Sequence, residues 1–410
     1  MYSLAIYLYM FCVNVVALFN HKARLMMRGH RDTWRILREK VDPEARYVWF
    51  HAASLGEFEQ GRPLMERLRR EHPEKKILLT FFSPSGYEVR KDYKGADIVC
   101  YLPFDTPFNA LKFVRLARPE AALFIKYEFW RNYIDILHRR GVPVYSVSSI
   151  FRKGQIFFRP YGMFYSRCLR RLTHLFVQNE ESRQLLSTIG VTAVTVTGDT
   201  RFDRVREIMG QARPLPLVEA FAKGDAPLLV CGSTWPPDED IIIPYFNAHP
   251  TLRLVLAPHV VSEEHIRDIE SKLKLPALRY SKATEEEAQR ARCLIIDGYG
   301  LLSSIYRYAT VAYVGGGFGV GIHNVPEAAV YGVPVLIGPN HAKFKEAGDL
   351  IAAGGCMEIR GAEDFKGIMD HLLSDKAALD AAGRAAGGYI KENSGASDKI
   401  YDTIFGNSQK

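Results

Sequence analysis

The feature that most constrains the fold is a glycine-rich turn between two short apolar runs late in the chain. Val311–Val314 is typical of a buried strand, and Val335–Ile337 is typical of the next one. The turn contains five glycines within seven residues, at Gly315, Gly316, Gly317, Gly319 and Gly321. A helix is expected to begin near Asn324 or Val325, with Asn324 as the N-cap and Pro326 near the first turn. The segment therefore predicts a unit of strand, turn, helix and parallel strand.

The turn itself allows two interpretations. Glycine lets backbone N–H groups approach a ligand closely, and a helix that begins there adds the positive end of its dipole, which favours an anion. The G-x-G-x-x-G spacing of dinucleotide-binding turns is absent, however, and a purely structural tight turn explains the glycines equally well. Glu327, in the expected first turn of the helix, either stabilises the helix dipole or accepts hydrogen bonds from the two hydroxyls of a ribose.

The same alternation of strand, loop and helix runs through the chain and predicts an α/β fold with two doubly wound, Rossmann-like domains. Residues 206–226 interrupt the pattern with Pro214 and Pro216, and we interpret them as a linker. The predicted N-terminal domain is then 21–205 and the predicted C-terminal domain 227–410. Ligands of such sheets bind at the carboxyl ends of the strands, so a functional cleft is expected between the two domains.

The N-terminus predicts a membrane anchor helix over residues 1–20. The first nineteen residues carry no charge, and basic residues follow from Lys22 onward, which favours a cytoplasmic location for the rest of the chain. A cleaved signal peptide would need positive charge before the apolar run. Asn14 and three tyrosines interrupt the apolar run, so a helix lying in the membrane interface is a second interpretation.

The composition restricts the chemical class of the binding partner but does not identify it. The net charge of +8 favours an anionic partner. No groove-reading motif or aromatic RNA-binding platform accompanies it, so we expect no nucleic acid. The six cysteines are scattered without metal-ligand spacing, so neither a zinc site nor a disulfide framework is indicated.

A series of short motifs gives the chain a family resemblance. They occur in one order: HAASLGE at 51–57, FFSPSGYE at 81–88, YLPFDTP at 101–107, KYEFW at 126–130, VQNEES at 177–182, TGDTRFD at 197–203, GSTWPPDE at 232–239, APH at 257–259 and GIHNVPEA at 321–328. The whole series resembles the 3-deoxy-D-manno-octulosonic acid (Kdo) transferases, which are inverting glycosyltransferases of GT-B architecture.

The resemblance implies a function at the inner (plasma) membrane, with both catalytic domains on the cytoplasmic side. It implies transfer of Kdo from CMP-Kdo to the lipid A precursor, lipid IVA, in lipopolysaccharide core biosynthesis. No metal or other cofactor is expected. Two alternatives remain: another GT-B nucleotide-sugar enzyme, such as a sugar-nucleotide 2-epimerase, or a membrane-bound nucleotide-binding module without catalysis.

Three residues match positions that the resemblance connects with catalysis. Glu57 corresponds to the general base, which takes the proton of the acceptor hydroxyl, although a carboxylate that only caps a helix is the competing interpretation. Arg201 stands where the family usually has a lysine, and a cation there offsets charge on the departing nucleotide. Lys126 replaces a glutamate with an assigned role in many members, which makes Glu128, two residues on, a candidate substitute.

The resemblance also implies the contacts to the donor nucleotide, all in the C-terminal domain. His259 stands where other members have arginine, and Ser233 is either a hydroxyl donor or a plain N-cap. The expected donor-binding residues are Ser233, Pro258, His259, Tyr299, Gly300, Leu301, Asn324, Val325, Pro326 and Glu327.

Overall fold

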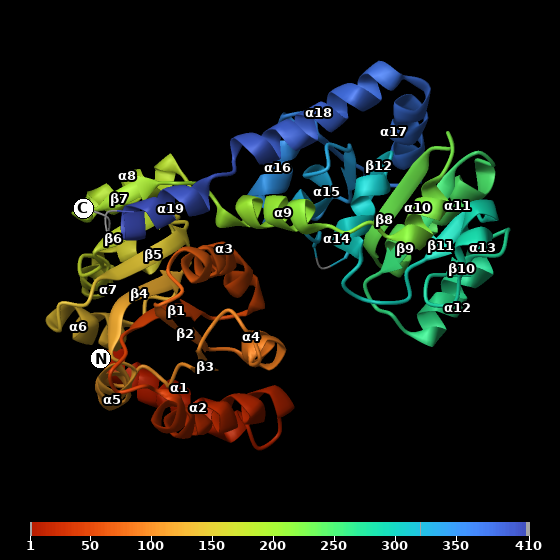
Figure 1. Cartoon of the computed structure of the whole chain (residues 1–410). Coiled ribbons are helices and arrows are strands. Elements are labelled where there is room, and N and C mark those ends of the chain that lie inside the picture. Colours follow the sequence, from red (N-terminus) through yellow and green to blue (C-terminus); the bar gives the residue numbers. More distant parts are fainter. Residues whose placement is uncertain (1, 320, 407–410) are drawn as a thin grey trace. The chain divides into compact units, whose positions relative to one another are not determined.

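The computed structural model describes residues 2–319 and 321–406, which form two compact units (Figure 1). Met1–Arg204 and Ser394–Lys410 form the first unit, and Val205–Asn393 forms the second. Each unit contains a seven-stranded sheet in which all neighbouring strands pair in parallel. This is the expected pair of doubly wound Rossmann-like sheets, and the GT-B class is confirmed.

The first sheet has the strand order β3-β2-β1-β4-β5-β6-β7, so the chain winds outward in both directions from β1 and β4. Its strands are β1 (Tyr47–Ala52), β2 (Lys76–Phe81), β3 (Ile98–Tyr101), β4 (Pro119–Ile125), β5 (Val144–Ser149), β6 (His174–Val177) and β7 (Val194–Val196). Its helices are α1 (Tyr2–Val16), α2 (His21–Lys40), α3 (Leu55–Glu71), α4 (Pro84–Arg90), α5 (Pro107–Ala117), α6 (Arg131–Arg139), α7 (Met163–Leu169), α8 (Glu180–Thr188) and α19 (Ala396–Phe405).

The second sheet has the order β10-β11-β9-β8-β12-β13-β14, with β8 and β12 at the point where the winding direction changes. Its strands are β8 (Leu228–Thr234), β9 (Arg253–Pro258), β10 (Leu278–Arg279), β11 (Cys293–Ile295), β12 (Val311–Val314), β13 (Val335–Ile337) and β14 (Cys356–Glu358). The accompanying helices are α10 (Pro216–Ala222), α11 (Pro236–Ala248), α12 (Glu263–Lys272), α13 (Glu285–Arg290), α14 (Leu302–Ile305), α15 (Pro326–Ala329), α16 (Lys345–Ala352), α17 (Ala362–Ser374) and α18 (Lys376–Glu392).

Both faces of the first sheet are buried, as β1 demonstrates. Tyr47 and Trp49 belong to one hydrophobic core, whereas Val48 and Phe50 belong to another. Successive side chains of a strand point to opposite faces, so β1 separates two cores that helices cover from either side. This explains why β1 is apolar throughout until His51 and the turn that follows it.

The predicted domain boundaries differ from the structure in two places. The segment 206–226, interpreted as a linker, is mostly helical: it holds the end of α9 (Thr200–Gln211) and all of α10, in which Phe221 is fully buried. Pro216 lies in the first turn of α10, where a missing N–H costs nothing, so the proline that suggested a break begins a helix.

The last residues were assigned to the C-terminal domain but lie in the first unit. There Arg67 of α3 donates hydrogen bonds to Asp398 at 3.0 Å and Asp402 at 2.7 Å.

Helix α1 occupies most of the predicted anchor segment. Among the described residues, no helix combines the length and apolarity that crossing a membrane requires. Ile6 of α1 packs with Met26 and Phe104, and the Tyr2 hydroxyl donates to Asp105 Oδ2 at 2.6 Å. One face of α1 is therefore attached to the first unit.

Candidate active site

Glu57 lies in the first turn of α3, immediately after the carboxyl end of β1. Its Oε2 accepts the backbone N–H of Ala53 at 2.5 Å, and the backbone N–H of Phe58 bonds the carbonyl of Ser54, which is the N-cap. The Glu57 carboxylate therefore accepts a backbone N–H beside the start of α3, as a helix-capping side chain does, and this hydrogen bond also fixes its position. β1 and β4 are the strands between which ligands bind in sheets of this order.

The environment of Glu57 is unusual for a surface carboxylate. Burial raises its pKa to about 7, and the nearby Glu128 carboxylate adds to this effect. The Ala53 N–H and the Lys126 ammonium act in the opposite direction. A carboxyl group with this pKa is able to accept a proton at neutral pH and to release it again.

Glu128 follows the end of β4 and is held by two aromatic side chains. The Trp130 indole N–H donates to its Oε2 at 2.7 Å, and His51 Nε2 lies 3.1 Å from the same oxygen. His51 is fully buried, and its Nδ1 lies 2.9 Å from the hydroxyl of Thr80. The carboxylate that raises the pKa of Glu57 is therefore fixed from β1, β2 and the segment after β4.

Lys126 has the left-handed conformation that side chains rarely adopt, with φ of 60°. Its backbone N–H donates to the carbonyl of Val147 at 2.8 Å, and its own carbonyl accepts the hydroxyl of Ser149 at 2.7 Å. Such strain persists only where the surroundings determine the backbone, and here β5 does so.

Arg201 lies at the start of α9 and forms an ion pair with Asp199. Its Nε and Nη2 each lie 2.8 Å from Asp199 Oδ2. Burial acts to raise the pKa of Asp199, but the Arg201 guanidinium more than offsets this effect and lowers it. The predicted cation is thus present in the first unit, with a buried anion beside it.

The charges of both Glu57 and Arg201 act on the hydroxyl of Tyr127. Burial raises the pKa of its hydroxyl; the Asp199 and Glu57 carboxylates raise it further, whereas Arg152 and Arg201 lower it. The three residues assigned to catalysis are therefore gathered at one end of the first sheet, around Tyr127 and the switch point between β1 and β4.

The second unit presents backbone groups and aromatic rings at its own switch point. Asp238 is buried and accepts three hydrogen bonds: from the Trp235 N–H at 2.9 Å, the Tyr313 hydroxyl at 2.6 Å and the Gly316 N–H at 3.0 Å. Ser233 precedes this loop with φ of 53° and is not the N-cap of α11, which is Trp235. Asp238 thus fixes the glycine turn against the loop after β8.

An aromatic stack covers this turn. The rings of Trp235 and His259 lie 4.8 Å apart, those of His259 and His323 lie 4.4 Å apart, and burial lowers the pKa of His323. His259 is exposed and directly follows Pro258, the last residue of β9.

Another group of predicted donor residues follows β11. Tyr299 is exposed, and its hydroxyl accepts the N–H of Val261 at 3.3 Å. Gly300 has φ of 86°, and Leu301 is the N-cap of α14. The structure leaves the predicted nucleotide contacts of these residues untested.

The helix after the glycine turn differs from the prediction. α15 has only four residues, with Val325 as its N-cap and Pro326 as its first residue. Asn324 does not cap it, because its side-chain amide donates to Glu327 Oε1 at 2.7 Å instead. The glycines act in close packing: a Cβ on Gly315 would lie 2.4 Å from the Ser233 carbonyl oxygen.

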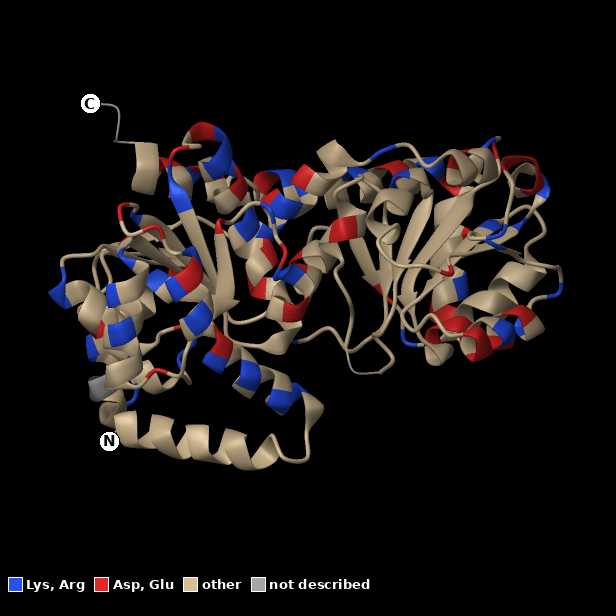
Figure 2. Ribbon diagram, turned by 60° about the horizontal axis from the view of Figure 1, so that its bottom comes forward, with Lys and Arg blue, Asp and Glu red and all other residues tan. Residues whose placement is uncertain are grey.

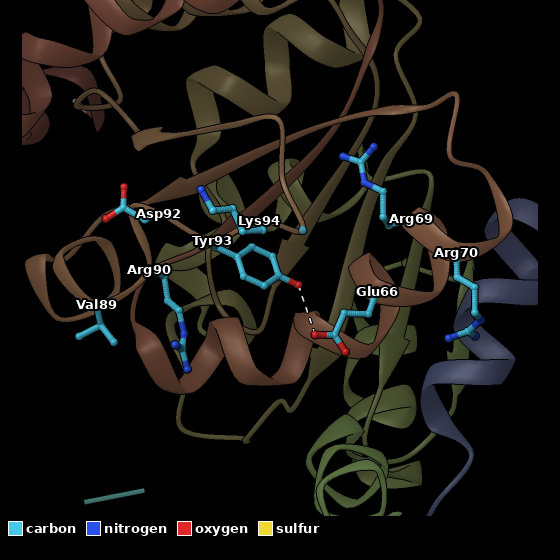
Figure 3. A pocket seen from close by; sticks show the side chains of 9 residues that line it. Glu66, Arg69, Arg70, Val89, Arg90, Asp92, Tyr93 and Lys94 are labelled. Carbon is cyan, nitrogen blue, oxygen red and sulfur yellow. Dashed lines mark hydrogen bonds between the residues drawn. The ribbon is translucent and has the colours of Figure 1, made fainter. Parts of the chain in front are cut away.

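A cavity of about 600 Å³ lies elsewhere in the first unit, between α3 and the turn after α4 (Figure 3). Its lining includes Arg69, Arg70 and Lys94, and the Tyr93 hydroxyl donates to Glu66 at 3.5 Å. None of the predicted site residues lines it. Within residues 2–319 and 321–406, no three His, Cys, Asp or Glu side chains are placed to hold a metal ion.

Sequence reasoning missed three residues that position the site. Asp199, His51 and Asp238 all lie in the quoted motifs, but their partners are remote: the Asp199 and Gln60 side chains are 139 positions apart. The sequence offered one signal for these residues: each is a polar residue within a motif that was interpreted through another of its residues.

Comparisons with known proteins identify relatives of the chain. A family described as 3-Deoxy-D-manno-octulosonic-acid transferase (kdotransferase) matches residues 26–204, most of the first unit. Among curated proteins, 3-deoxy-D-manno-octulosonic acid transferases align with both units. The protein from Haemophilus influenzae is 26% identical, over 88% of this chain and 87% of the relative. The one from Bordetella pertussis is 28% identical, over 88% and 87%.

Solved structures support the fold. A putative UDP-N-acetylglucosamine 2-epimerase from Listeria monocytogenes has a TM-score of 0.61 at 17% identity, covering 88% of this chain and 96% of that one. MurG from Acinetobacter baumannii has a TM-score of 0.55 at 12% identity, covering 88% and 99%. The relatives, the family match over the first unit and the motif series agree, and they identify the chain as a glycosyltransferase related to the 3-deoxy-D-manno-octulosonic acid (Kdo) transferases.

Proposed function

We propose that this enzyme transfers Kdo from CMP-Kdo to the lipid A precursor lipid IVA, in lipopolysaccharide core biosynthesis, with inversion at the anomeric carbon. The family and the names of its relatives support the sugar and the reaction class. The observation that carries the proposal is Glu57: a fixed carboxylate with a pKa near 7 at the switch point of the first sheet.

In this mechanism the acceptor hydroxyl attacks the anomeric carbon of Kdo as the bond to the CMP phosphate breaks. Glu57 takes the proton of the attacking hydroxyl, and a single displacement inverts the configuration. Burial, with a further contribution from the Glu128 carboxylate, keeps the pKa of Glu57 high enough for this step. Arg201 offsets negative charge on the leaving phosphate or holds the carboxylate of Kdo. Bound metal is not required, because side-chain cations and backbone N–H groups supply the compensating charge.

The donor nucleotide belongs, in this proposal, to the second unit. The turn fixed by Asp238 and the stack of Trp235, His259 and His323 offer N–H groups and ring faces that suit a phosphate and a base. Glu327, already paired with Asn324, is the proposed partner of the ribose hydroxyls. The remaining residues of the donor set are Ser233, Pro258, Tyr299, Gly300, Leu301, Val325 and Pro326.

We also propose that the enzyme works on the cytoplasmic face of the inner membrane. The outer face of α1 exposes Leu4, Leu8 and Phe11, and Figure 2 shows α1 without charge beside the basic residues of α2. Apolar side chains next to lysine and arginine suit a helix that lies in the interface of an anionic bilayer.

The test is release of CMP from CMP-Kdo by the purified protein, in the presence of chelator, with tetra-acylated lipid A precursor as acceptor. We expect turnover by the wild type and a loss of about a hundredfold or more in kcat for Glu57→Gln, with CMP binding retained. UDP-N-acetylglucosamine is the control donor. Turnover with that donor but not with CMP-Kdo, or an unimpaired Glu57→Gln variant, would overturn the proposal.

A further inference from the structure

Asp199 is a buried anion that receives hydrogen-bond donors from α3, from the start of α9 and from β5, where the Ser148 hydroxyl lies 3.5 Å from Oδ1. Asp199 is 6% exposed and lies where the chain enters α9. Oδ1 accepts the Gln60 side-chain N–H at 2.9 Å and the backbone N–H of Arg201 at 2.9 Å, and Oδ2 accepts the guanidinium. A carboxylate only accepts hydrogen bonds, so the Gln60 amide must direct its nitrogen toward it.

The pairing of Asp199 with Arg201 fixes an orientation as well as a charge. Nε and Nη2 of Arg201 contact the same carboxylate oxygen, so one edge of the planar guanidinium is held in place. The opposite edge points away from Asp199, and the Arg201 side chain is 35% exposed. A long flexible side chain is thereby ordered before any ligand arrives, which lowers the entropic cost of using it.

Gln60 connects this pair to the helix that carries the base. Glu57 and Gln60 are three residues apart in α3, so they lie one turn from each other on neighbouring positions of the helix surface. Gln60 is fully buried, and its side-chain N–H donates to Asp199. The base and the cation are therefore joined by one chain of contacts: α3, Gln60, Asp199 and Arg201.

We propose that Asp199 is a positioning residue that orients the Arg201 guanidinium and, through Gln60, sets its placement relative to Glu57. This inference rests on the proposed function, because it takes Arg201 and Glu57 as participants in one transfer reaction. Asp199 itself touches neither substrate.

The activity test is a double-mutant cycle on the full chain, measured as kcat for CMP release. Asp199→Asn keeps the shape of the side chain but removes its charge and is expected to lower kcat by about 10- to 100-fold. In an Arg201→Ala background the same substitution should lower kcat by less than about twofold, because residues that act as a unit are not additive. Equal losses in both backgrounds, or an Arg201→Ala variant as active as the wild type, would overturn the proposal.

Asp97→Asn is the matched control. Asp97 is also a carboxylate paired with an arginine: it lies 2.5 Å from Arg69 at the cavity of Figure 3, and it accepts the N–H of Ile77 at 2.8 Å. Its removal should lower the melting temperature as Asp199→Asn does while leaving kcat unchanged. If Asp97→Asn lowers kcat as much as Asp199→Asn, loss of stability explains both and the proposal fails.

A second readout does not depend on turnover. In protein labelled with 15N-arginine, the Nε–H signal of Arg201 should exchange slowly with water in the wild type and rapidly in Gln60→Leu and Asp199→Asn. If the wild-type signal is slow but CMP-Kdo is not consumed, the proposed function fails and the positioning contact stands. If Arg201 Nε–H exchanges rapidly in the wild type, Asp199 does not hold the guanidinium and the inference fails.

Discussion

The two units share a winding pattern but place different chemistry at the strands where the pattern changes direction. In the first unit, β1 and β4 lead to Glu57, Glu128 and the strained Lys126. In the second, β8 and β12 lead to a glycine turn that the buried Asp238 of α11 fixes through internal hydrogen bonds. The same topology thus leaves charged side chains to interact in the first unit and uses a carboxylate to fix the backbone in the second. In the proposed mechanism the first arrangement serves proton transfer and the second serves contact with the donor nucleotide.

From this difference between the two units, we expect substitutions in the second unit to change the affinity for the donor nucleotide and the local stability of the fold. The largest effect is expected for Gly315→Ala, because the new Cβ would lie 2.4 Å from the Ser233 carbonyl oxygen and 2.8 Å from the Thr234 Cα. Backbone must move, at a cost of about 3 kcal/mol. Calorimetric titration with CMP should show binding weakened by more than about tenfold.

Gly319→Ala is the control for this substitution. The nearest atom to a Cβ on Gly319 is the Gly316 carbonyl oxygen at 3.8 Å, which is ordinary contact. CMP should therefore bind to this variant as to the wild type. Equal losses for the two alanine variants would mean that the turn is sensitive to any side chain, and that close packing against Ser233 is not the reason.

Part of this arrangement was predictable from sequence. The strand pattern places the ends of β1 and β12, and with them Glu57 and the glycine turn, because apolar runs separated by turn residues have a local signal. Arg201 was also located, by its motif.

The remaining features depend on contacts that no local pattern reveals. Asn324 bonds Glu327 instead of capping α15, and Pro216 starts a helix where a linker was expected. In the sequence, Gln60 is an ordinary polar residue of a predicted helix, and its hydrogen bond to Asp199 is evident only from the fold. Local sequence predicts elements, whereas the groups that orient the site come from residues far apart in the chain.

A smaller effect is expected on stability at the first switch point. The folded-state pKa of Glu57, about 7, lies above its ordinary value of 4.5, so between these pH values the folded protein holds a proton that the unfolded chain has lost. Stability from this group is present at low pH and is lost as the pH rises through 7. Glu57→Gln should therefore stabilise the enzyme by about 2 kcal/mol at pH 8 and by little at pH 5. Urea unfolding of both proteins at the two pH values measures the difference; a stabilisation independent of pH would contradict the account.

The second unit is predicted to show a weaker dependence at His265. Burial acts to lower the pKa of His265, but its hydrogen bond to the buried Glu239, at 2.9 Å, more than offsets this effect and raises it. A raised pKa means that the stabilisation is complete below about pH 6.5 and is lost as the pH rises through the folded-state value. His265→Gln should cost about 1 kcal/mol at pH 6 and less at pH 9, as measured by thermal melting. An equal cost at both pH values would show that the proton on His265 is unimportant.

In the proposed mechanism Glu57 is the base, and its pKa is raised by burial and by the Glu128 carboxylate. The most direct measurement is the pH dependence of kcat/KM for Kdo transfer, in the wild type and in Glu128→Gln. The kcat/KM of the wild type should rise with pH through an apparent pKa of about 7. In Glu128→Gln this rise should move to lower pH, because a negative charge beside Glu57 has been removed. A wild-type profile that is flat between pH 5 and 8, or a rise that Glu128→Gln leaves in place, would contradict this mechanism.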